Sequence, residues 1–313
     1  VTIAATADGG GGTLTFTGTT DLTYAYSAGG QGPHLRVNKT AGTVTPAIGT
    51  TDLSVDLFSL LAGAFTAPSG TLTVGRHLGG TGAGETFFTV SGGTFTHNSG
   101  TVRLVAREEG SGPSSETFTV DVATSLTLNN IIIDSFNTGS AIDTITTATG
   151  DTVIAAGTFT HTDGVLGGAW EVLGNVTIAA TADGGGGTLT FTGSANQTYT
   201  DNGGNEPDGS ITINKTSGTV TLASNADWNA TGQNLTITAG TLNQGASYNL
   251  ATGLLTVGAS GILKNIGTGD LTIGGTLDNS GTVRIDANAS CVGTDDILIR
   301  SSVAATARTW QGS

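Results

Sequence analysis

The chain has 313 residues, 51 of them Gly, and only 11% carry a charged side chain, against the roughly 25% that is usual for a globular protein. Its 10 Lys and Arg against 24 Asp and Glu leave a formal net charge of −14. This balance argues against nucleic acid as a partner, since phosphate binding needs clustered Lys and Arg, and equally against an anionic membrane surface. A soluble chain so poor in charge must be hydrated through hydroxyl and amide groups, and its abundant Thr suits a pleated, half-exposed strand surface.

The single cysteine, Cys291, cannot form a disulfide within the chain, so it is either a buried small apolar side chain or an intermolecular link. No signal peptide and no apolar run of about 18 residues is present, so we expect no membrane insertion in this segment. The chain starts at Val within a repeat and contains no Met, which indicates a processed product or a piece of a longer protein. Its acidic, Thr- and Asn-rich composition favours an extracellular location on the cell surface.

One stretch, VTIAATADGGGGTLTFTG, occurs twice without a change, at 1–18 and at 176–193. Its four glycines suit a tight corner with positive φ, and they are not a phosphate loop, because GGGGT lacks the Lys and no helix follows. The flanking sequence has diverged, so the identity reflects either recent duplication or a surface used twice in assembly. The residues of this expected assembly surface are Asp8, Gly9, Gly10, Gly11, Gly12, Asp183, Gly184, Gly185, Gly186 and Gly187.

The segments after this stretch repeat as well, which divides the chain into two imperfect tandem copies. Residues 1–110 form the first copy and 176–290 the second, while 111–175 connect them and 291–313 start a further coil or terminal segment. Each expected strand is a run of about five to eight residues bounded by Gly, Asn or Ser. The strands are expected at 13–18, 35–46, 52–57, 70–75 and 86–105, and at 188–193, 211–222, 234–242, 253–261 and 270–285. Two more are expected within 125–134, where Asn129–Asn130 forms either a corner or an Asn ladder.

A shorter period within each copy predicts the fold. The pattern Leu-Thr-Ile/Val recurs at Leu235, Leu255 and Leu271, roughly 16–20 residues apart, and the matching positions in the first copy are Leu53, Leu72 and Phe88. Tandem immunoglobulin-like sandwiches need about 100 residues each, whereas this period fits one coil of a β-solenoid. We therefore predict an all-β chain, a single right-handed parallel β-helix in which these residues stack inward. Antiparallel pairing would instead indicate tandem β-sandwiches.

The string INKTSGTVTL, followed by NLTITAGTL, LLTVG and GTLDNSGTVRI (211–285), resembles the Thr-, Gly- and Asn-rich repeats of very large bacterial surface proteins. The ending ILIRSSVAATARTW (297–310) is similar to a segment that follows such repeats. More broadly, the chain resembles β-helical adhesins and autotransporter passengers, including filamentous-haemagglutinin-like proteins. The resemblance implies export and a parallel β-helix, and it carries over no catalytic or binding residue.

The loop DNGGNEPDG (201–209) is the candidate metal site, because hard oxygen ligands at close spacing can bind Ca²⁺. Its ligands would be Asp201, Asn205, Glu206 and Asp208. The equivalent loop of the first copy (27–34) has no acid, so a metal is not part of the repeat itself. The other interpretation is a solvated acidic loop. Apart from this possible Ca²⁺ site, we expect no cofactor.

Two histidines, His97 and His161, hold the same place in two GTFTH segments. On stacked coils they could share a metal ion, but no third ligand is evident. The alternative is that both are simply polar positions at strand ends.

One dense charged cluster, formed by Arg103, Arg107 and Glu108–Glu109, is either a catalytic groove or the solvated end of a strand that discourages edge pairing. No pair of carboxylates with a base and no Ser, His and Asp arrangement can be assigned from spacing, so we expect no enzyme.

The composition and the repeats together favour an extracellular structural protein of a bacterium: a β-helical stalk, a filament or a surface-layer component, with adhesive use. Its partners would be further copies of itself, end to end or side by side, or the rest of a longer repeat chain, together with surface glycans. The alternative is a carbohydrate-binding or polysaccharide-cleaving β-helix with its substrate along one face. Trp170, Trp228 and Trp310 are far apart in the sequence, which argues against an aromatic platform for sugar binding.

Overall fold

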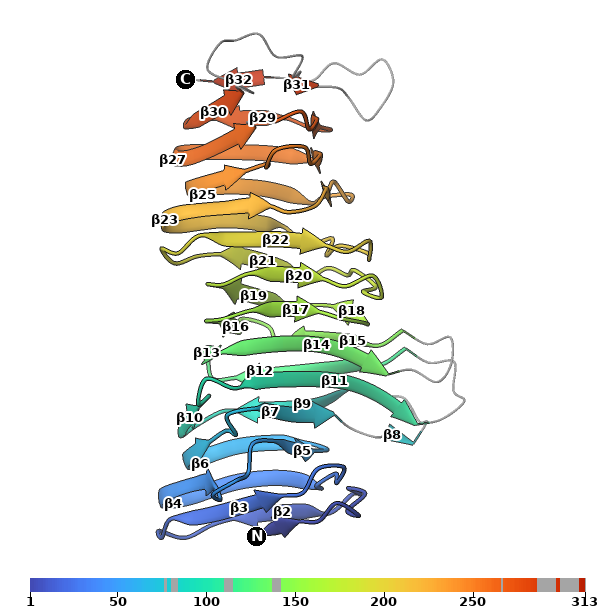
Figure 1. The fold of residues 1–313 in the computed structure, drawn as a ribbon, viewed down its shortest axis with the longest axis vertical. Helices are drawn as coiled ribbons and strands as arrows, with labels where there is room; N and C mark the ends of the chain where they lie inside the picture. The colour runs from blue at the N-terminus through green and yellow to red at the C-terminus, as the bar shows by residue number, and fades with distance from the viewer. Residues whose placement is uncertain are drawn as a thin grey trace. The chain divides into compact units, whose positions relative to one another are not determined.

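The structure is a computed structural model that describes residues 1–75, 78–79, 84–109, 115–136, 142–265, 267–285, 297–298 and 310–312. Within these residues every regular element is a β-strand and none is a helix, so the fold is all-β (Figure 1). The chain divides into two compact units. Unit 1 contains Val1–Gly157 and His161–Gly168, and unit 2 contains Thr158–Thr160 and Ala169–Ser313. The boundaries expected from the repeats, at 110, 175 and 290, follow sequence similarity and stay a prediction.

The strands are short and numerous in both units. Unit 1 contains β1 (Thr2–Ile3), β2 (Thr13–Phe16), β3 (Leu22–Tyr26), β4 (His34–Pro46), β5 (Leu53–Val55), β6 (Phe58–Thr66), β7 (Thr71–Gly75), β8 (Leu78–Gly79), β9 (Glu85–Val90), β10 (Thr94–Thr96), β11 (Thr101–Glu109), β12 (Thr117–Val122), β13 (Ser125–Leu128), β14 (Asn130–Phe136), β15 (Thr144–Thr147), β16 (Thr152–Ala155) and β18 (Val165–Leu166). Unit 2 contains β19 (Ala169–Val172), β20 (Val176–Ile178), β21 (Thr188–Phe191), β22 (Gln197–Asp201), β23 (Ile211–Leu222), β24 (Ala226–Trp228), β25 (Asn234–Asn243), β26 (Leu250–Thr252), β27 (Leu254–Asn265), β28 (Leu271–Ile273), β29 (Leu277–Asn279), β30 (Thr282–Ile285), β31 (Ile297–Leu298) and β32 (Trp310–Gly312). The strand β17 (Phe159–His161) has residues in both.

Parallel pairing connects the strands of each unit into ladders. A strand pairs with a partner roughly 20–30 residues further along the chain, as Ile211 does with Leu235 and Phe58 with Phe88. Antiparallel pairing, which tandem sandwiches require, does not occur among the pairings of the described strands, so that alternative is wrong.

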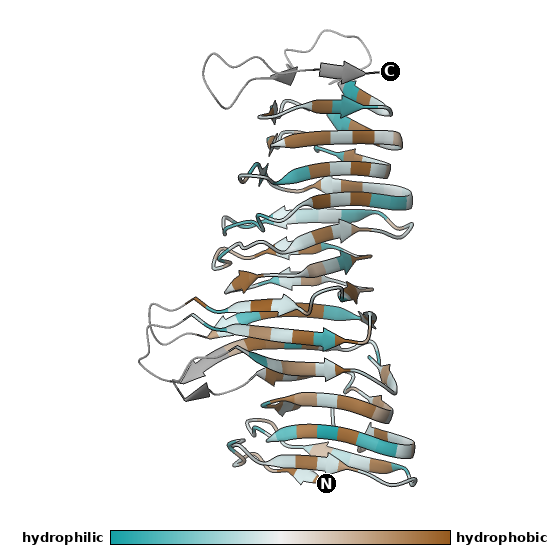
Figure 2. Ribbon diagram, turned by 180° about the vertical axis from the view of Figure 1, so that it is seen from behind, coloured by the Kyte–Doolittle hydropathy of each residue, from teal (hydrophilic) through white to brown (hydrophobic). Residues whose placement is uncertain are grey.

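The apolar core of unit 2 is built as a column of residues in register. Leu189 pairs with Ile211, Ile211 with Leu235, Leu235 with Leu255, and Leu255 with Leu277, and each of the five is buried. Successive strand residues point to opposite faces, so Thr alternates with these residues on the outer face. Figure 2 shows the result as bands of hydrophobic and hydrophilic residues along the strands.

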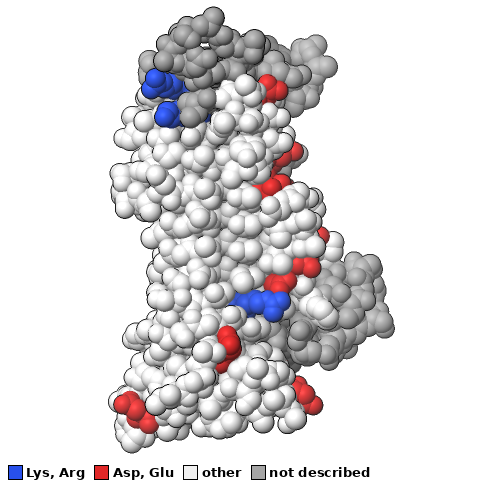
Figure 3. Space-filling model, viewed as in Figure 1, with Lys and Arg blue, Asp and Glu red and all other residues white. Residues whose placement is uncertain are grey.

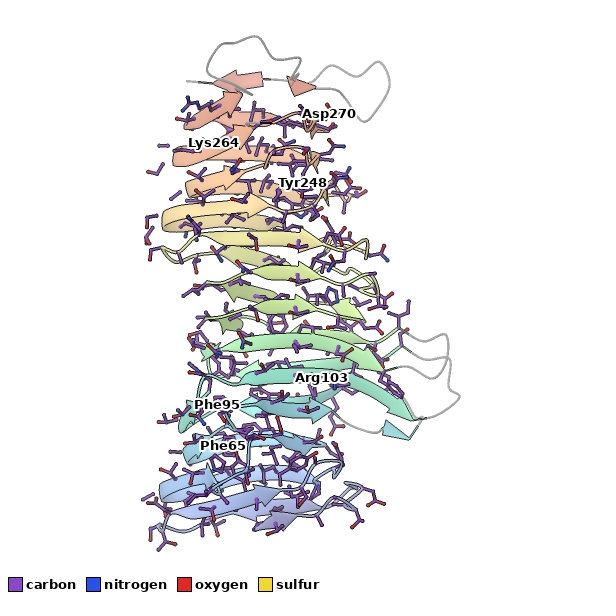
Figure 4. All side chains as sticks on the ribbon, in the orientation of Figure 1. Phe65, Phe95, Arg103, Tyr248, Lys264 and Asp270 are labelled. Carbon is purple, nitrogen blue, oxygen red and sulfur yellow. The ribbon has the colours of Figure 1, made fainter. Side chains whose placement is uncertain are left out.

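Unit 1 has the same construction with larger side chains. Leu35, Phe58 and Phe88 form one column through β4, β6 and β9. Phe65 of β6 and Phe95 of β10, labelled in Figure 4, extend it into an aromatic cluster, with their ring centroids 5.8 Å apart. Such aromatic pairs add about 0.5–1.5 kcal/mol beyond the apolar area that they bury.

The stacking expected from the Leu-Thr-Ile/Val pattern is right for its first two members and wrong for the third. Leu235 pairs with Leu255, but Leu271 pairs with Leu250, in the separate ladder of β24, β26 and β28. In the first copy, Leu53 pairs with Leu72 as expected, while Phe88 pairs with Phe58 instead. The reason is that strands of two separate ladders carry the same alternation of apolar residues and Thr, so the period alone does not tell which ladder a strand joins.

The strand β4 of unit 1 and its counterpart β23 in unit 2 each turn a corner next to a buried lysine. The register shifts at Asn38 in β4 and at Asn214 in β23, and the lysines that follow, Lys39 and Lys215, are only 1% and 2% exposed. Each ammonium group donates hydrogen bonds to oxygens of the preceding turn, for example Lys215 Nζ to Thr192 O at 2.9 Å. Lys is almost never fully buried unless its charge is paired or hydrogen-bonded, so these bonds make its burial possible.

A glycine on the next strand makes room for each buried lysine. A Cβ on Gly240 would lie 2.7 Å from Cβ of Lys215, and one on Gly63 would lie 2.7 Å from Cβ of Lys39. Both glycines also have positive φ.

We expect Gly240→Ala to destabilise unit 2 more than Gly232→Ala. Both glycines have positive φ, 82° and 85°, so alanine at either position carries about 1–2 kcal/mol of left-handed strain. Only Gly240 also has a neighbour within 3 Å, while nothing lies within 4 Å of Gly232, so overlap adds roughly 1–3 kcal/mol there. Urea unfolding measures the difference in the free energy of unfolding, and equal losses would contradict the packing role of Gly240.

Candidate functional site

An acidic cavity of about 460 Å³ opens on unit 2, where three corner segments meet. These segments are the loop after β20, the end of β22 with the loop after it, and β24 with the residues around it. Five carboxylates line the cavity, from Asp183, Asp201, Glu206, Asp208 and Asp227. Three amides line it too, from Asn205, Asn225 and Asn229, and no Lys, Arg or His is among the described residues of its wall.

All four residues of the expected Ca²⁺ loop, Asp201, Asn205, Glu206 and Asp208, line this cavity. The sequence did not indicate that Asp183 and Asp227 join them. A backbone bridge between Asp183 and Asn205, and the hydrogen bond from Asp227 N to Glu206 Oε2 at 2.9 Å, bring the three segments together. No short motif signals these contacts, because their partners are more than 20 positions apart, as for Asp227 and Glu206 with a separation of 21.

The carboxylates surround the cavity rather than converge on one point. In the part of the chain that the structure describes, no three His, Cys, Asp or Glu side chains form a group that could hold a metal ion. Ca²⁺ prefers six to eight oxygen ligands at about 2.3–2.6 Å, some of which can be amides or waters. Ca²⁺ binding at this loop therefore stays a prediction.

Glu206 is the most strongly perturbed of these acids. Burial, followed by the negative charges of Asp201 and Asp227, raises its pKa to about 8, although the hydrogen bond from Asp227 N lowers it. At neutral pH, Glu206 is thus mostly protonated within a ring of carboxylates.

Two buried donors lie behind Glu206. The Tyr199 hydroxyl and the Trp228 indole Nε1 are fully buried and have no partner in hydrogen-bonding geometry. Their rings meet edge-on, with centroids 5.1 Å apart, and the Tyr199 hydroxyl is directed at the Glu206 carboxyl and the Trp228 indole. Burial and the charge of Glu206 raise the pKa of Tyr199, so its hydroxyl keeps its proton as a donor.

At the same corner of the first copy, side chains bond to one another, and the cavity of about 200 Å³ beside them is lined by Gln31 and Arg103 rather than by a set of acids. The bridge between Asp8 and Gln31 matches that between Asp183 and Asn205. Here Asp56 accepts hydrogen bonds from Gly10 N at 2.9 Å and from Gln31 Nε2 at 3.0 Å, and it is 7% exposed. Gly32 stands where the second copy has Glu206, before a proline in both, and a Cβ on Gly32 would lie 2.7 Å from Ile3 Cδ1. The acidic cavity is therefore a property of the second copy alone.

The expected assembly surface is a corner with the same backbone in both copies. Gly9 and Gly184 have φ of 75° and 76°, and Gly10 and Gly185 have φ of 105° and 108°, which confirms the tight-corner interpretation. Nothing lies within 4 Å of a Cβ built on Gly11, Gly12 or Gly186. Asp183 and Gly184 line the acidic cavity, whereas a Cβ on Gly9 would lie 2.6 Å from Asp56 Oδ1. Use of this surface in assembly stays a prediction.

The two histidines are not brought together, so the expectation of stacked coils is wrong for them. His97 follows β10, which pairs with β6, whereas His161 ends β17 in another ladder. His97 Nδ1 accepts a hydrogen bond from Ser99 N, while His161 is fully buried and its Nε2 bonds to Gly164 O at 2.7 Å.

Of the expected charged cluster, the structure describes the side chain of Arg103. The guanidinium of Arg103 forms an ion pair with Asp134 of the neighbouring β14, and its Nε donates to Asp134 Oδ2 at 2.8 Å. The side chains of 107–109, the residue Cys291 and the side chain of Trp310 lie outside the described residues. Trp170 and Trp228 are buried, so neither offers a ring to a sugar.

No known protein family, no curated protein and no solved structure matches the chain at a significant level. Among the described residues, no helix has the length and the apolar character needed to span a membrane.

We expect the stability of unit 2 to fall as the pH rises from 4.5 through 8. The folded-state pKa of Glu206, about 8, lies above its ordinary value of 4.5, so the folded chain keeps a proton that the unfolded chain releases. Glu206→Gln should flatten this part of the pH profile, measured as the free energy of unfolding between pH 4 and 9.

Asp201→Asn provides the second arm of this measurement. It removes a charge that raises the pKa of Glu206, so the fall in stability should shift to lower pH without disappearing. Identical pH profiles for wild type and Glu206→Gln would contradict the assignment.

Proposed function

We propose that this chain is a segment of a right-handed parallel β-helix that serves as an extracellular structural scaffold, a stalk, filament or surface-layer component of a bacterium. The observation that supports it most is the coil-to-coil register within each unit. Apolar columns run through successive parallel strands, and a protein of this kind gains its stability as a sum of coil and neighbour terms.

Ladders of Asn and Asp at the corners support the same proposal. In unit 2, Asn225 Oδ1 accepts from Asn249 N, and Asn249 Oδ1 accepts from Asp270 N, both at 2.9 Å (Asp270 is labelled in Figure 4). In unit 1, Asp52 Oδ1 accepts from Thr71 N at 2.8 Å. Each corner side chain satisfies a backbone donor of the next coil, which a long regular stack needs at every level.

The surface chemistry suits a passive scaffold as well. Figure 3 shows one face on which few side chains are charged and most of the surface is uncharged. The buried tryptophans leave no aromatic platform among the described side chains of β19 and β24.

Electron microscopy of the purified chain tests the scaffold and its self-assembly. We expect continuous fibres, with strands spaced about 4.8 Å along the fibre axis in diffraction. Isolated monomeric rods at high concentration would contradict the filament form, and antiparallel cross-strand spacings would contradict the β-helix.

If the glycine corner is the assembly surface, Gly11→Gln together with Gly186→Gln should stop fibre formation while leaving the free energy of unfolding unchanged. Both positions have open space around them and no positive φ, so the fold tolerates a side chain there. Thr231→Gln, at an exposed position of unit 2, is the matched control. A normal yield of fibres from the glycine double variant would contradict a role of this corner in assembly.

A carbohydrate-binding role is the second candidate, and the acidic cavity is what favours it. Its volume is within the roughly 300–1,000 Å³ typical of small-molecule sites, and its wall is made of amides and carboxylates. A glycan array and a reducing-sugar assay against acidic and neutral polysaccharides test it. Binding that Glu206→Gln abolishes would support this role. The absence of both glycan binding and released reducing sugar would contradict it and leave the scaffold as the proposed function.

A further inference from the structure

A serine and a histidine form a hydrogen-bonded pair on the outer face of unit 1. His34 begins β4 and Ser59 follows Phe58 in β6, and His34 Nε2 lies 2.8 Å from Ser59 Oγ. Both side chains are partly exposed, because they alternate along their strands with the buried residues of the core. A serine hydroxyl within about 2.6–3.2 Å of an imidazole nitrogen has the geometry of a nucleophile with its base.

A contact on the other side of the ring favours the tautomer that a base needs. Thr13 of β2 pairs in register with His34, and Thr13 Oγ1 lies 3.5 Å from His34 Nδ1, at the long end of a hydrogen bond. With its proton on Nδ1, the ring donates to Thr13 Oγ1 and its Nε2 accepts from the Ser59 hydroxyl. Nε2 can then take the proton of Ser59 when the oxygen reacts.

Two more side chains lie on the same face next to the pair. Arg36 is exposed and pairs in register with Ser59, and the ion pairs of the described residues do not include it. A guanidinium group at this position can stabilise negative charge that develops beside Ser59. Leu57 is half-buried and comes one position before the inward-facing Phe58, so it offers an apolar contact on the outer face.

We propose that Ser59 and His34 are the nucleophile and the base of an acyl-transfer site that hydrolyses esters. Ser59 Oγ attacks the ester carbonyl carbon and its proton passes to His34 Nε2. The bond from this carbon to the alcohol oxygen breaks, and the leaving alcohol takes the proton from His34. Water then attacks the acyl group on Ser59 and gives a proton to His34. The acid leaves, and Ser59 recovers its proton from His34.

The open position of the pair indicates which esters fit. Ser59 and His34 line neither the acidic cavity nor the cavity beside Gln31. A sheet face admits an extended molecule but does not enclose a long acyl chain, so the substrate class is a short acyl ester on an exposed hydroxyl, as in an O-acylated polysaccharide. The proposal does not depend on the scaffold function.

The second copy keeps the frame without the pair. Ser210 stands where the first copy has His34, and Thr236 stands where it has Ser59. The sequence spacing did not reveal the pair, because 25 positions separate its two members and only strand register brings them together. Unit 2 therefore supplies the residues that remove the site without changing the fold.

Labelling of the folded chain with a fluorophosphonate tests the proposal. An activated serine oxygen bonds to the phosphorus of this probe and displaces fluoride, and peptide mass spectrometry locates the adduct. We expect a single adduct, on Ser59, and hydrolysis of p-nitrophenyl acetate that the labelling abolishes. Ser59→Ala should abolish both reactions, and His34→Gln should slow them about 100-fold.

Three further variants define the roles. His34→Ser restores the residue of the second copy and should match His34→Gln. Arg36→Gln should slow ester hydrolysis while leaving the pair intact. His97→Gln removes another partly exposed histidine and should change neither reaction. Urea unfolding shows that each variant compared is folded.

Equal labelling of the wild type and both His34 variants would overturn the site, because the hydrogen bond would then be structural only. Adducts spread over several serines would overturn it in favour of unselective reaction. No adduct and no ester hydrolysis in the folded wild-type chain would overturn it outright.

Discussion

Parallel stacking in register is the interaction on which the rest of the structure depends. Each inward residue contacts its partner on the next strand, so Ile211 lies between Leu189 and Leu235 and can change only within the space that both leave. The same constraint explains the corners. Lys215 is buried there because oxygens of the preceding turn accept its hydrogen bonds and because the next strand presents Gly240, which has no side chain. Lys215 and Gly240 are therefore compatible because they pack against each other on neighbouring strands, and neither segment alone predicts this pair.

The duplicated stretch shows that two corners with the same sequence can have different side chains around them. Asp8 and Asp183 start identical glycine corners with matching φ angles, and both bridge to the following turn in the same way. Around Asp8 the side chains of Asp56 and Gln31 bond to each other. Around Asp183 the neighbouring strands supply acids instead, and these line the acidic cavity. The difference lies in residues that are one and two levels away.

The sequence was informative wherever a property is local. Alternation and bounding glycines predicted β23 at Ile211–Leu222 to the residue, and Asn129 does separate β13 from β14 as expected. Pairing was only partly predictable, since Leu271 carries the same pattern as Leu255 but belongs to another ladder. For the site, the loop 201–209 was identifiable from its own acids, because they are close in sequence. Asp227 and the donors behind Glu206 were not, because their proximity depends on strand register.

A repeated stack of parallel strands and an acidic cavity are compatible for a physical reason. In a stack where each strand contacts mainly its neighbours, a substitution at one corner affects the packing of the two adjacent strands and leaves the remaining apolar columns intact. Glu206 and Asp227 line the cavity and are not part of the apolar column. The column consists of Leu189, Ile211 and Leu235, so the acids add negative charge at the corner and leave the core apolar. The rings of Tyr199 and Trp228 are buried in contact with each other, and the Tyr199 hydroxyl lies at the Glu206 carboxyl. Tyr199 therefore links the acidic corner to the buried rings.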